Sequence, residues 1–204
     1  MPAEKEDAYK TKARLLHDIQ DITQYQPILD KDNFQHEESH WRQLSKTTIS
    51  LFQVLIDQDL KDLVRVLKHY PRYTQWVCEH FRYAYSYSEN EADIEAASEL
   101  LHLGEPYFSK QFVRNVVRKL PGLDALDTEE LSYFSQKMRT EYTSWHSIVT
   151  EYYCQRYTDK INALSLHPLQ RITLMKPINE ISYTQEYDYQ SQDRDAVLDI
   201  PYMN

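Results

Sequence analysis

The residues in this sequence best suited to chemistry form two short Glu-x-x-His patterns. Their members are Glu37 with His40, and Glu99 with His102. Residues three positions apart lie on the same face of a helix, so each pattern can offer a carboxylate and an imidazole to one metal ion. Two such patterns with two further carboxylates build the di-iron or di-manganese centre of ferritin-like bundles. The further ligands would come from Asp18, Glu141 or Glu151.

The positions of these pairs in the chain weaken the metal interpretation. The chain has 32 acidic residues and 8 histidines, so chance pairs at this spacing are expected. Glu37 would stand near the start of its helix, and His102 closely precedes Gly104, a residue typical of a helix end. Metal sites of helical bundles form in mid-helix, where neighbouring helices hold the ligands. A ferritin-like metalloprotein with iron or manganese is therefore the alternative, and the favoured interpretation has no cofactor.

Other kinds of catalytic site lack the residues that they require. A phosphate-binding loop, a dinucleotide-binding turn and a nucleophile elbow each need closely spaced glycines. The chain has only 2 glycines, Gly104 and Gly122, and they are far apart. Cys78 lies two residues before His80, and residues at that spacing do not face each other on a helix. The sequence identifies no catalytic residue and favours a non-enzymatic protein.

A basic stripe is expected on the helix that follows Pro106. Lys110, Arg114 and Arg118 recur every four residues, which places them on one helix face opposite an apolar face. Such a stripe can receive an acidic partner or the acidic end of the same chain. The simpler alternative is a solvated charged face. The three basic residues are candidate partner-binding residues.

The last part of the chain, residues 177–204, differs from the rest in composition. It holds one basic residue, Arg194, against six acidic residues, with tyrosines interleaved. Tyrosine offers apolar area and a polar tip, and it is enriched at protein interfaces. This stretch is predicted to be a tail or docking arm, with residues 1–176 forming the helical domain. The candidate partner-binding tyrosines are Tyr183, Tyr187, Tyr189 and Tyr202.

Helical periodicity recurs along most of the chain and predicts the elements that must hold these residues. The expected helices cover about residues 4–24, 35–56, 60–70, 73–84, 91–103, 106–120 and 127–164. Asp127 and Glu130 match a capping box, with Thr128 as a competing cap. The last helix would span about 55 Å, so we expect a break near Thr143 and Ser144, or an exposed end that pairs with another chain. His167 and Pro168 are expected to close the helical region.

Composition and charge restrict the partners and the compartment. The chain has 204 residues, of which 41% are hydrophobic and 27% charged, as in an ordinary globular domain. Its net charge of -9 disfavours nucleic acid and anionic membranes as partners. The N-terminal segment lacks the pattern of a signal peptide, and the longest apolar stretch, residues 49–56, is too short to span a bilayer. Two distant cysteines, Cys78 and Cys154, suit a reducing compartment, so a cytoplasmic protein is expected, or a nuclear one in a eukaryote.

These observations predict an all-α fold, a compact bundle of about six to eight helices with an irregular or partly extended acidic C-terminal arm. The predicted function is that of a non-enzymatic protein–protein interaction module: an adaptor, a chaperone-like subunit or a component of a larger assembly. Protein partners are expected, and both homo- and hetero-oligomers are compatible with the sequence. The tyrosine surplus, the over-long helix and the acidic arm support this hypothesis.

Overall fold

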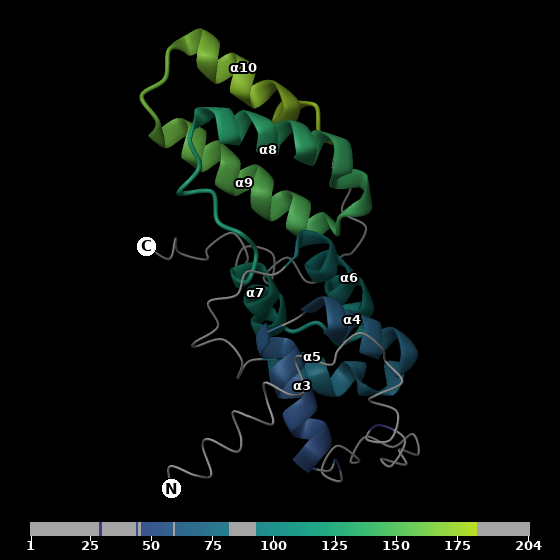
Figure 1. The fold of residues 1–204 in the computed structure, drawn as a ribbon. Helices are drawn as coiled ribbons and strands as arrows, with labels where there is room; N and C mark the ends of the chain where they lie inside the picture. Colours follow the sequence, from purple (N-terminus) through teal and green to yellow (C-terminus); the bar gives the residue numbers. More distant parts are fainter. Residues whose placement is uncertain (1–28, 30–43, 45, 59, 82–92, 183–204) are drawn as a thin grey trace, which may run out of the picture. The chain divides into compact units, whose positions relative to one another are not determined.

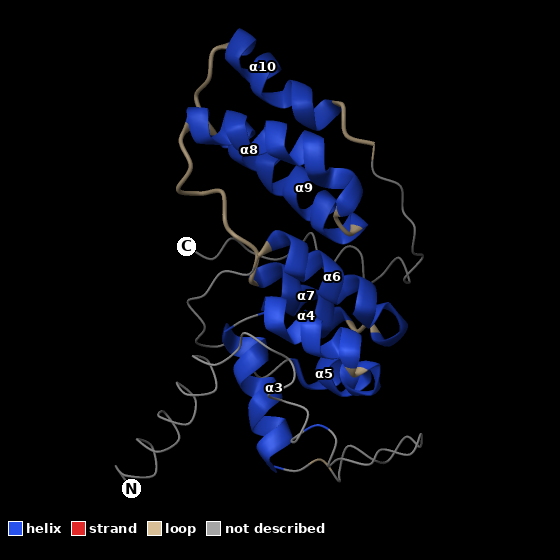
Figure 2. Ribbon diagram, turned by 45° about the vertical axis from the view of Figure 1, so that its right-hand side comes forward, coloured by secondary structure: helices blue, strands red, loops and turns tan. Residues whose placement is uncertain are grey.

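Helices account for nearly all of the regular structure. The computed structural model describes residues 29, 44, 46–58, 60–81 and 93–182 (Figure 1). Of these residues 82% are helical, in eight α-helices, and none of them lies in a strand (Figure 2). The predicted all-α, multi-helix fold is confirmed for this part of the chain. None of the helices in these ranges is both long enough and apolar enough to cross a membrane.

The chain divides into two compact units, residues 1–90 and 91–204. The described part of the first unit contains α3 (Lys46–Gln58), α4 (Leu60–His69), a 3-10 turn (Pro71–Tyr73) and α5 (Thr74–His80). Four apolar side chains at helical spacing on α4 are buried: Leu60, Leu63, Val64 and Leu67. Burial of each such side chain contributes about 1.5–3 kcal/mol, which fixes this face of α4 toward the core.

Aromatic contacts complete the core of the first unit. The ring of Phe52 on α3 lies 5.0 Å from that of Tyr73 and 5.8 Å from that of Trp76. The buried hydroxyl of Tyr73 donates a hydrogen bond to the carbonyl oxygen of Leu29 at 2.9 Å. This hydrogen bond satisfies the Tyr73 hydroxyl, which would be costly to bury without a partner.

The second unit contains five helices among its described residues: α6 (Ile94–Gly104), α7 (Lys110–Arg118), α8 (Thr128–Glu141), α9 (Ser147–Ala163) and α10 (Pro168–Asn179). A 3-10 turn, η5 (Glu105–Tyr107), follows α6, and another, η6 (Tyr142–Ser144), follows α8. Helices α8, α9 and α10 lie side by side in both views (Figures 1 and 2). The buried hydroxyl of Tyr157 on α9 donates to the carbonyl oxygen of Leu174 on α10 at 2.8 Å.

Helix α8 begins with the predicted capping box. The carboxylate of Asp127 accepts hydrogen bonds from the backbone N–H groups of Glu129 at 3.0 Å and Glu130 at 2.9 Å. In return the Glu130 carboxylate accepts from the Asp127 N–H at 2.9 Å. Asp127, and not Thr128, is therefore the N-cap residue of α8.

The predicted break in the long helical pattern is confirmed. Helix α8 ends at Glu141, the 3-10 turn η6 follows, and α9 begins only at Ser147. Trp145 has extended backbone angles, φ -85° and ψ 152°, which end the helical path. The chain therefore turns back on itself, and α8 and α9 pack against each other as a helical hairpin.

Two predicted helix boundaries are wrong, the end of α6 and the start of α7. Gly104 was expected to follow a helix as its terminating residue, but it is the last residue of α6 itself, with φ -83°. Pro106 was expected to begin the next helix, but it lies in η5, and α7 begins at Lys110 after the N-cap Ser109. A 3-10 turn accepts a proline near its start, so the chain stays helical across Gly104 without a positive φ angle.

Helix α10 was not predicted. His167 and Pro168 were expected to close the helical region, but they open α10 as N-cap and first residue. The apolar residues of α10 form no continuous stripe, and Pro177 lies inside the helix, so periodicity does not reveal it. The predicted arm begins at Pro177, and the structure places Ile178 and Ile181 among the buried residues. The remainder of the arm, residues 183–204, lies outside the described residues.

Candidate functional site

His146 is a buried polar residue of the second unit with a hydrogen-bond partner at each ring nitrogen. It is the N-cap of α9, and its side chain is fully buried, with 0% exposure. Its Nδ1 accepts a hydrogen bond from the backbone N–H of Ile148 at 3.1 Å. Its Nε2 lies 2.9 Å from Oε1 of Glu105 in η5. The imidazole thus links the start of α9 to the turn that follows α6.

These two hydrogen bonds determine which nitrogen of His146 carries the proton. Nδ1 faces a backbone N–H, so it must act as an acceptor and carries no hydrogen. The single proton of the neutral ring therefore sits on Nε2, where it is donated to the Glu105 carboxylate. Both ring nitrogens are satisfied, which offsets the cost of burying the side chain.

His102 joins this pair to form a group with metal-ligand character. Ligand atoms of His102, Glu105 and His146 all lie within 4.8 Å of one another, the only such group among the described residues. Nδ1 of His102 lies 3.5 Å from the same Glu105 oxygen, and the His102 side chain is 44% exposed. Two imidazoles and one carboxylate are the ligands of many zinc and non-haem iron sites.

The tautomer of His146 argues against a metal at this group. A metal-bound histidine normally donates its second ring N–H to a neighbouring acceptor. In His146 the second nitrogen already accepts a backbone N–H, so binding a metal through Nε2 would require an imidazolate or the loss of the α9 cap. The geometry fits a hydrogen-bonded helix cap better than a metal centre.

Only one of the two predicted Glu-x-x-His patterns lies within the described residues. Glu37, His40 and the suggested extra ligand Asp18 lie outside the described residues. Glu99 and His102 both stand on α6, but Glu99 does not belong to the group that contains His102. The other suggested ligands, Glu141 and Glu151, are half-buried and also lie outside that group. The structure instead assigns Glu105 as the carboxylate neighbour of His102.

The sequence analysis missed Glu105 and His146, although a weak signal was present for His146. It is the first polar side chain after the predicted break and precedes the apolar pair Ile148 and Val149, as a helix N-cap does. His167 repeats the arrangement at α10, where its Nδ1 accepts from the Leu169 N–H at 3.2 Å. His167 is exposed, whereas His146 is buried against a carboxylate.

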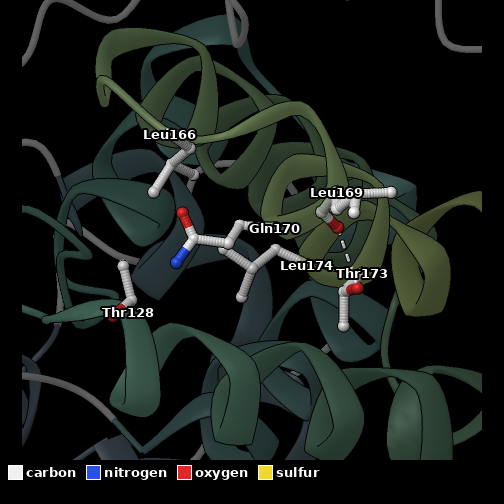
Figure 3. Close-up of a pocket in the computed structure, with 6 residues that line it drawn as sticks. All are labelled: Thr128, Leu166, Leu169, Gln170, Thr173 and Leu174. Carbon is white, nitrogen blue, oxygen red and sulfur yellow. Dashed lines mark hydrogen bonds between the residues drawn. The ribbon is translucent and has the colours of Figure 1, made fainter.

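Helix α10 carries a second feature with binding character. A pocket of about 300 Å³ opens between the first turns of α8 and α10 (Figure 3). Two apolar side chains of α10, Leu169 and Ile172, are 68% and 65% exposed. The residues that line the pocket are Thr128, Leu166, Leu169, Gln170, Thr173 and Leu174.

The predicted basic stripe lies on α7 as one helix face. Lys110 and Arg118 are exposed and Arg114 is half-buried, and none of the three forms an ion pair with the described residues. The opposite face is buried, through Phe112, Val113, Val116 and Val117. The other candidate partner-binding residues lie outside the described residues: Tyr183, Tyr187, Tyr189 and Tyr202.

Both cysteines are buried free thiols. Burial raises the pKa of Cys78 to about 12, and nearby Glu79 acts in the same direction. Burial likewise raises the pKa of Cys154 to about 12, with a smaller contribution from Glu151. Because the thiolate is the nucleophilic form, neither side chain is prepared for nucleophilic catalysis.

Comparison with known proteins gives no relative from which a function can be carried over. No family model, curated protein or solved structure matches this chain significantly. Its function is therefore inferred from the described side chains alone.

Proposed function

We propose that this chain is a non-enzymatic protein–protein interaction module, acting as an adaptor, a chaperone-like subunit or a component of a larger assembly. The observation that carries the proposal is the exposed apolar face of α10, formed by Leu169 and Ile172, of which Leu169 also lines the pocket. Its partner would be a protein segment that presents apolar side chains at helical spacing.

The exposed residues have the spacing of a helix-binding face. Leu169 and Ile172 are three positions apart, so they lie on the same side of α10. Removing apolar surface from water stabilises a complex by roughly 25 cal/mol per Å². An amphipathic partner helix lying along α10 would cover both side chains, which is a common mode of peptide recognition.

The pocket supplies a place for an anchoring side chain. Its volume of about 300 Å³ is lined mainly by apolar atoms of Leu166, Leu169 and Leu174. The Thr173 hydroxyl already donates to the Leu169 carbonyl oxygen at 2.9 Å, so it needs no further acceptor (Figure 3). Gln170 accepts from the His167 N–H through its side-chain oxygen, which leaves its amide NH₂ to bind a partner carbonyl.

Selection of peptides from a random library displayed on phage tests this proposal. The full chain is expected to select sequences with apolar residues at helical spacing. Leu169→Glu combined with Ile172→Glu should lose their binding, while Tyr133→Glu should keep it. Tyr133 is a suitable control because it is 73% exposed on α8 and does not line the pocket. Equal binding to all three proteins would contradict the proposal, and circular dichroism would establish that each variant is folded.

The alternative is a helical metal-binding protein that uses iron or manganese through Glu37, His40, Glu99 and His102. Among the described residues, His102 lies beside Glu105 and His146, but the hydrogen bond that Nδ1 of His146 accepts argues against a metal at that group. The proposed compartment for either function is the cytoplasm, or the nucleus of a eukaryote. The net charge of -9 continues to disfavour nucleic acid as a partner.

A further inference from the structure

We propose that the basic face of α7 binds an acidic segment of the same chain, residues 183–195, in an intramolecular contact. The basic face consists of Lys110, Arg114 and Arg118. This contact is separate from the apolar face of α10, and it would give the second unit a salt-sensitive internal ligand. Three observations support it: the charge on α7, the pattern of charge in the segment, and the place where the chain leaves α10.

The charges of the basic face are unfavourable in the absence of neighbouring carboxylates. Its three cations are four residues apart, and like charges at that spacing each destabilise a helix by about 0.2–0.5 kcal/mol. Lys110 also stands at the N-terminal end of α7, where the helix dipole disfavours a cation. None of the three is neutralised by a carboxylate of the described residues. An acidic segment laid along this face would remove both unfavourable terms.

The acidic segment carries carboxylates at a spacing that suits this face. Its acidic residues fall into two pairs, Glu186 with Asp188 and Asp193 with Asp195, and only Arg194 is basic. In an extended segment, residues two positions apart point to the same side and lie about 6.6–6.8 Å apart. Cations four residues apart on a helix are separated by about 6 Å along its axis. A carboxylate pair can therefore meet two successive cations of α7.

The tyrosines of the segment alternate with its first carboxylate pair. Glu186 and Asp188 occupy even positions, whereas Tyr183, Tyr187 and Tyr189 occupy odd positions, as do Asp193 and Asp195. If an extended segment directed Glu186 and Asp188 at α7, its tyrosine side chains would point away from the cations, and so would Asp193 and Asp195. One carboxylate pair at a time would then meet the basic face, and the tyrosines would remain accessible to a protein partner.

A series of neighbouring residues connects the end of α10 to the start of α7. Glu180, just beyond α10, lies 3.4 Å from Nε of Arg139 in the last turn of α8. The η6 turn then leads from α8 to His146, whose ring lies 6.0 Å from that of Phe108. Phe108 is two residues before Lys110, the first cation of the basic face.

The segment is also long enough to follow the face. From Ile181 and Ser182 at the end of the described residues, thirteen further residues reach Asp195. Fully extended, they cover up to about 43–47 Å. The basic face from Lys110 to Arg118 spans only about 12 Å. Because the segment is covalently attached, its effective concentration at the face would be in the millimolar range.

A nitroxide label on the full chain tests the contact directly. Ser191→Cys places a reactive thiol within the segment without altering its charge, because both native thiols are buried. The label is expected to broaden the amide NMR signals of residues 110–118. The broadening should disappear in 1 M NaCl, where the screening length falls to about 3 Å. It should also disappear in Lys110→Glu/Arg114→Glu/Arg118→Glu.

Two further variants distinguish loss of the contact from loss of folding. Lys137→Glu/Arg171→Glu/Lys176→Glu makes the same change of net charge at exposed positions on α8 and α10, and it should leave the broadening intact. Changing Glu186, Asp188, Asp193 and Asp195 to Lys in the α7 triple variant should restore the broadening. Absence of broadening in the labelled parent protein would overturn the proposal, as would broadening that persists unchanged in the α7 triple variant.

Discussion

Nε2 of His146 lies 2.9 Å from Oε1 of Glu105, and this hydrogen bond joins the start of α9 to the turn after α6. The same imidazole caps α9 through Nδ1, so one buried side chain performs two structural tasks. A buried polar residue thereby connects two parts of the second unit that are 41 positions apart in the sequence.

Replacement of His146 is expected to destabilise the second unit more than replacement of His167. His146→Ala removes the cap of α9 and the 2.9 Å hydrogen bond to the half-buried Glu105 carboxylate, so the free energy of unfolding should fall by about 2–4 kcal/mol. His167→Ala removes only an exposed cap, for which about 1 kcal/mol is expected. Urea unfolding followed by circular dichroism measures both values. Equal losses would show that the Glu105 contact contributes nothing.

Elemental analysis of the purified, untagged protein by mass spectrometry should find no stoichiometric metal. The one group with metal-ligand character among the described residues contains His146, whose tautomer holds the only ring proton on the nitrogen that would bind the ion. Near-stoichiometric iron or manganese would contradict this expectation. If the metal were then lost in His40→Ala and His102→Ala, the alternative function would become the leading one.

The two thiols should react with a thiol reagent such as 5,5′-dithiobis(2-nitrobenzoic acid) only when their units open. Cys78 and Cys154 are buried, and burial raises the pKa of each to about 12 from an ordinary 9.0. Because each unit contains one cysteine, Cys78→Ser leaves a reporter of the second unit and Cys154→Ser a reporter of the first. Rapid labelling of either variant under native conditions would contradict this expectation.

The same pKa shifts predict a loss of stability at alkaline pH. A thiol in the unfolded chain loses its proton near pH 9, whereas the folded thiol keeps it up to about pH 12. The unfolded state therefore binds fewer protons in this window, so the free energy of unfolding falls as pH rises from 9 to 12 and the full contribution is present below pH 9. Unfolding curves of the parent protein and of Cys78→Ser/Cys154→Ser compared across this range measure the effect. An identical pH dependence in both would refute it.

Tyr157→Phe should destabilise the packing of α10 on α9. The Tyr157 hydroxyl is buried and donates to the Leu174 carbonyl oxygen, so its removal should cost about 0.5–1.5 kcal/mol. Tyr133→Phe is the matched control, because Tyr133 is 73% exposed and should change stability by less than about 0.5 kcal/mol. Thermal unfolding of the two variants measures the difference, and equal midpoints would contradict the assigned role of the Tyr157 hydroxyl.

Local chemistry in the sequence predicted the parts of the fold that depend on neighbouring residues. The capping pair Asp127 and Glu130 identified the start of α8, and the excessive length of the apolar pattern located the break near Thr143. Helix α10 could not be found in this way. It is held by contacts with α8 and α9, such as the Tyr157 hydrogen bond, and not by a continuous apolar stripe of its own.

The group formed by His102, Glu105 and His146 could likewise be predicted only in part from the sequence. Spacing along one helix identified His102, but its nearest partners arrive from η5 and from the start of α9. Glu105 and His146 are 41 positions apart, and no periodic pattern links residues at that separation. Only the packing of α6 and α9 brings them together.

The short break between α8 and α9 has a consequence for assembly. If η6 and Trp145 straightened into helix, residues 128–163 would form one rod of about 54 Å, and α9 and α10 would leave the surface of α8. A second chain in the same open form presents the identical surfaces, so each could complete the other by domain swapping. In that case the few residues of this hinge would decide whether the chain closes on itself or exchanges α9 and α10 with a second copy.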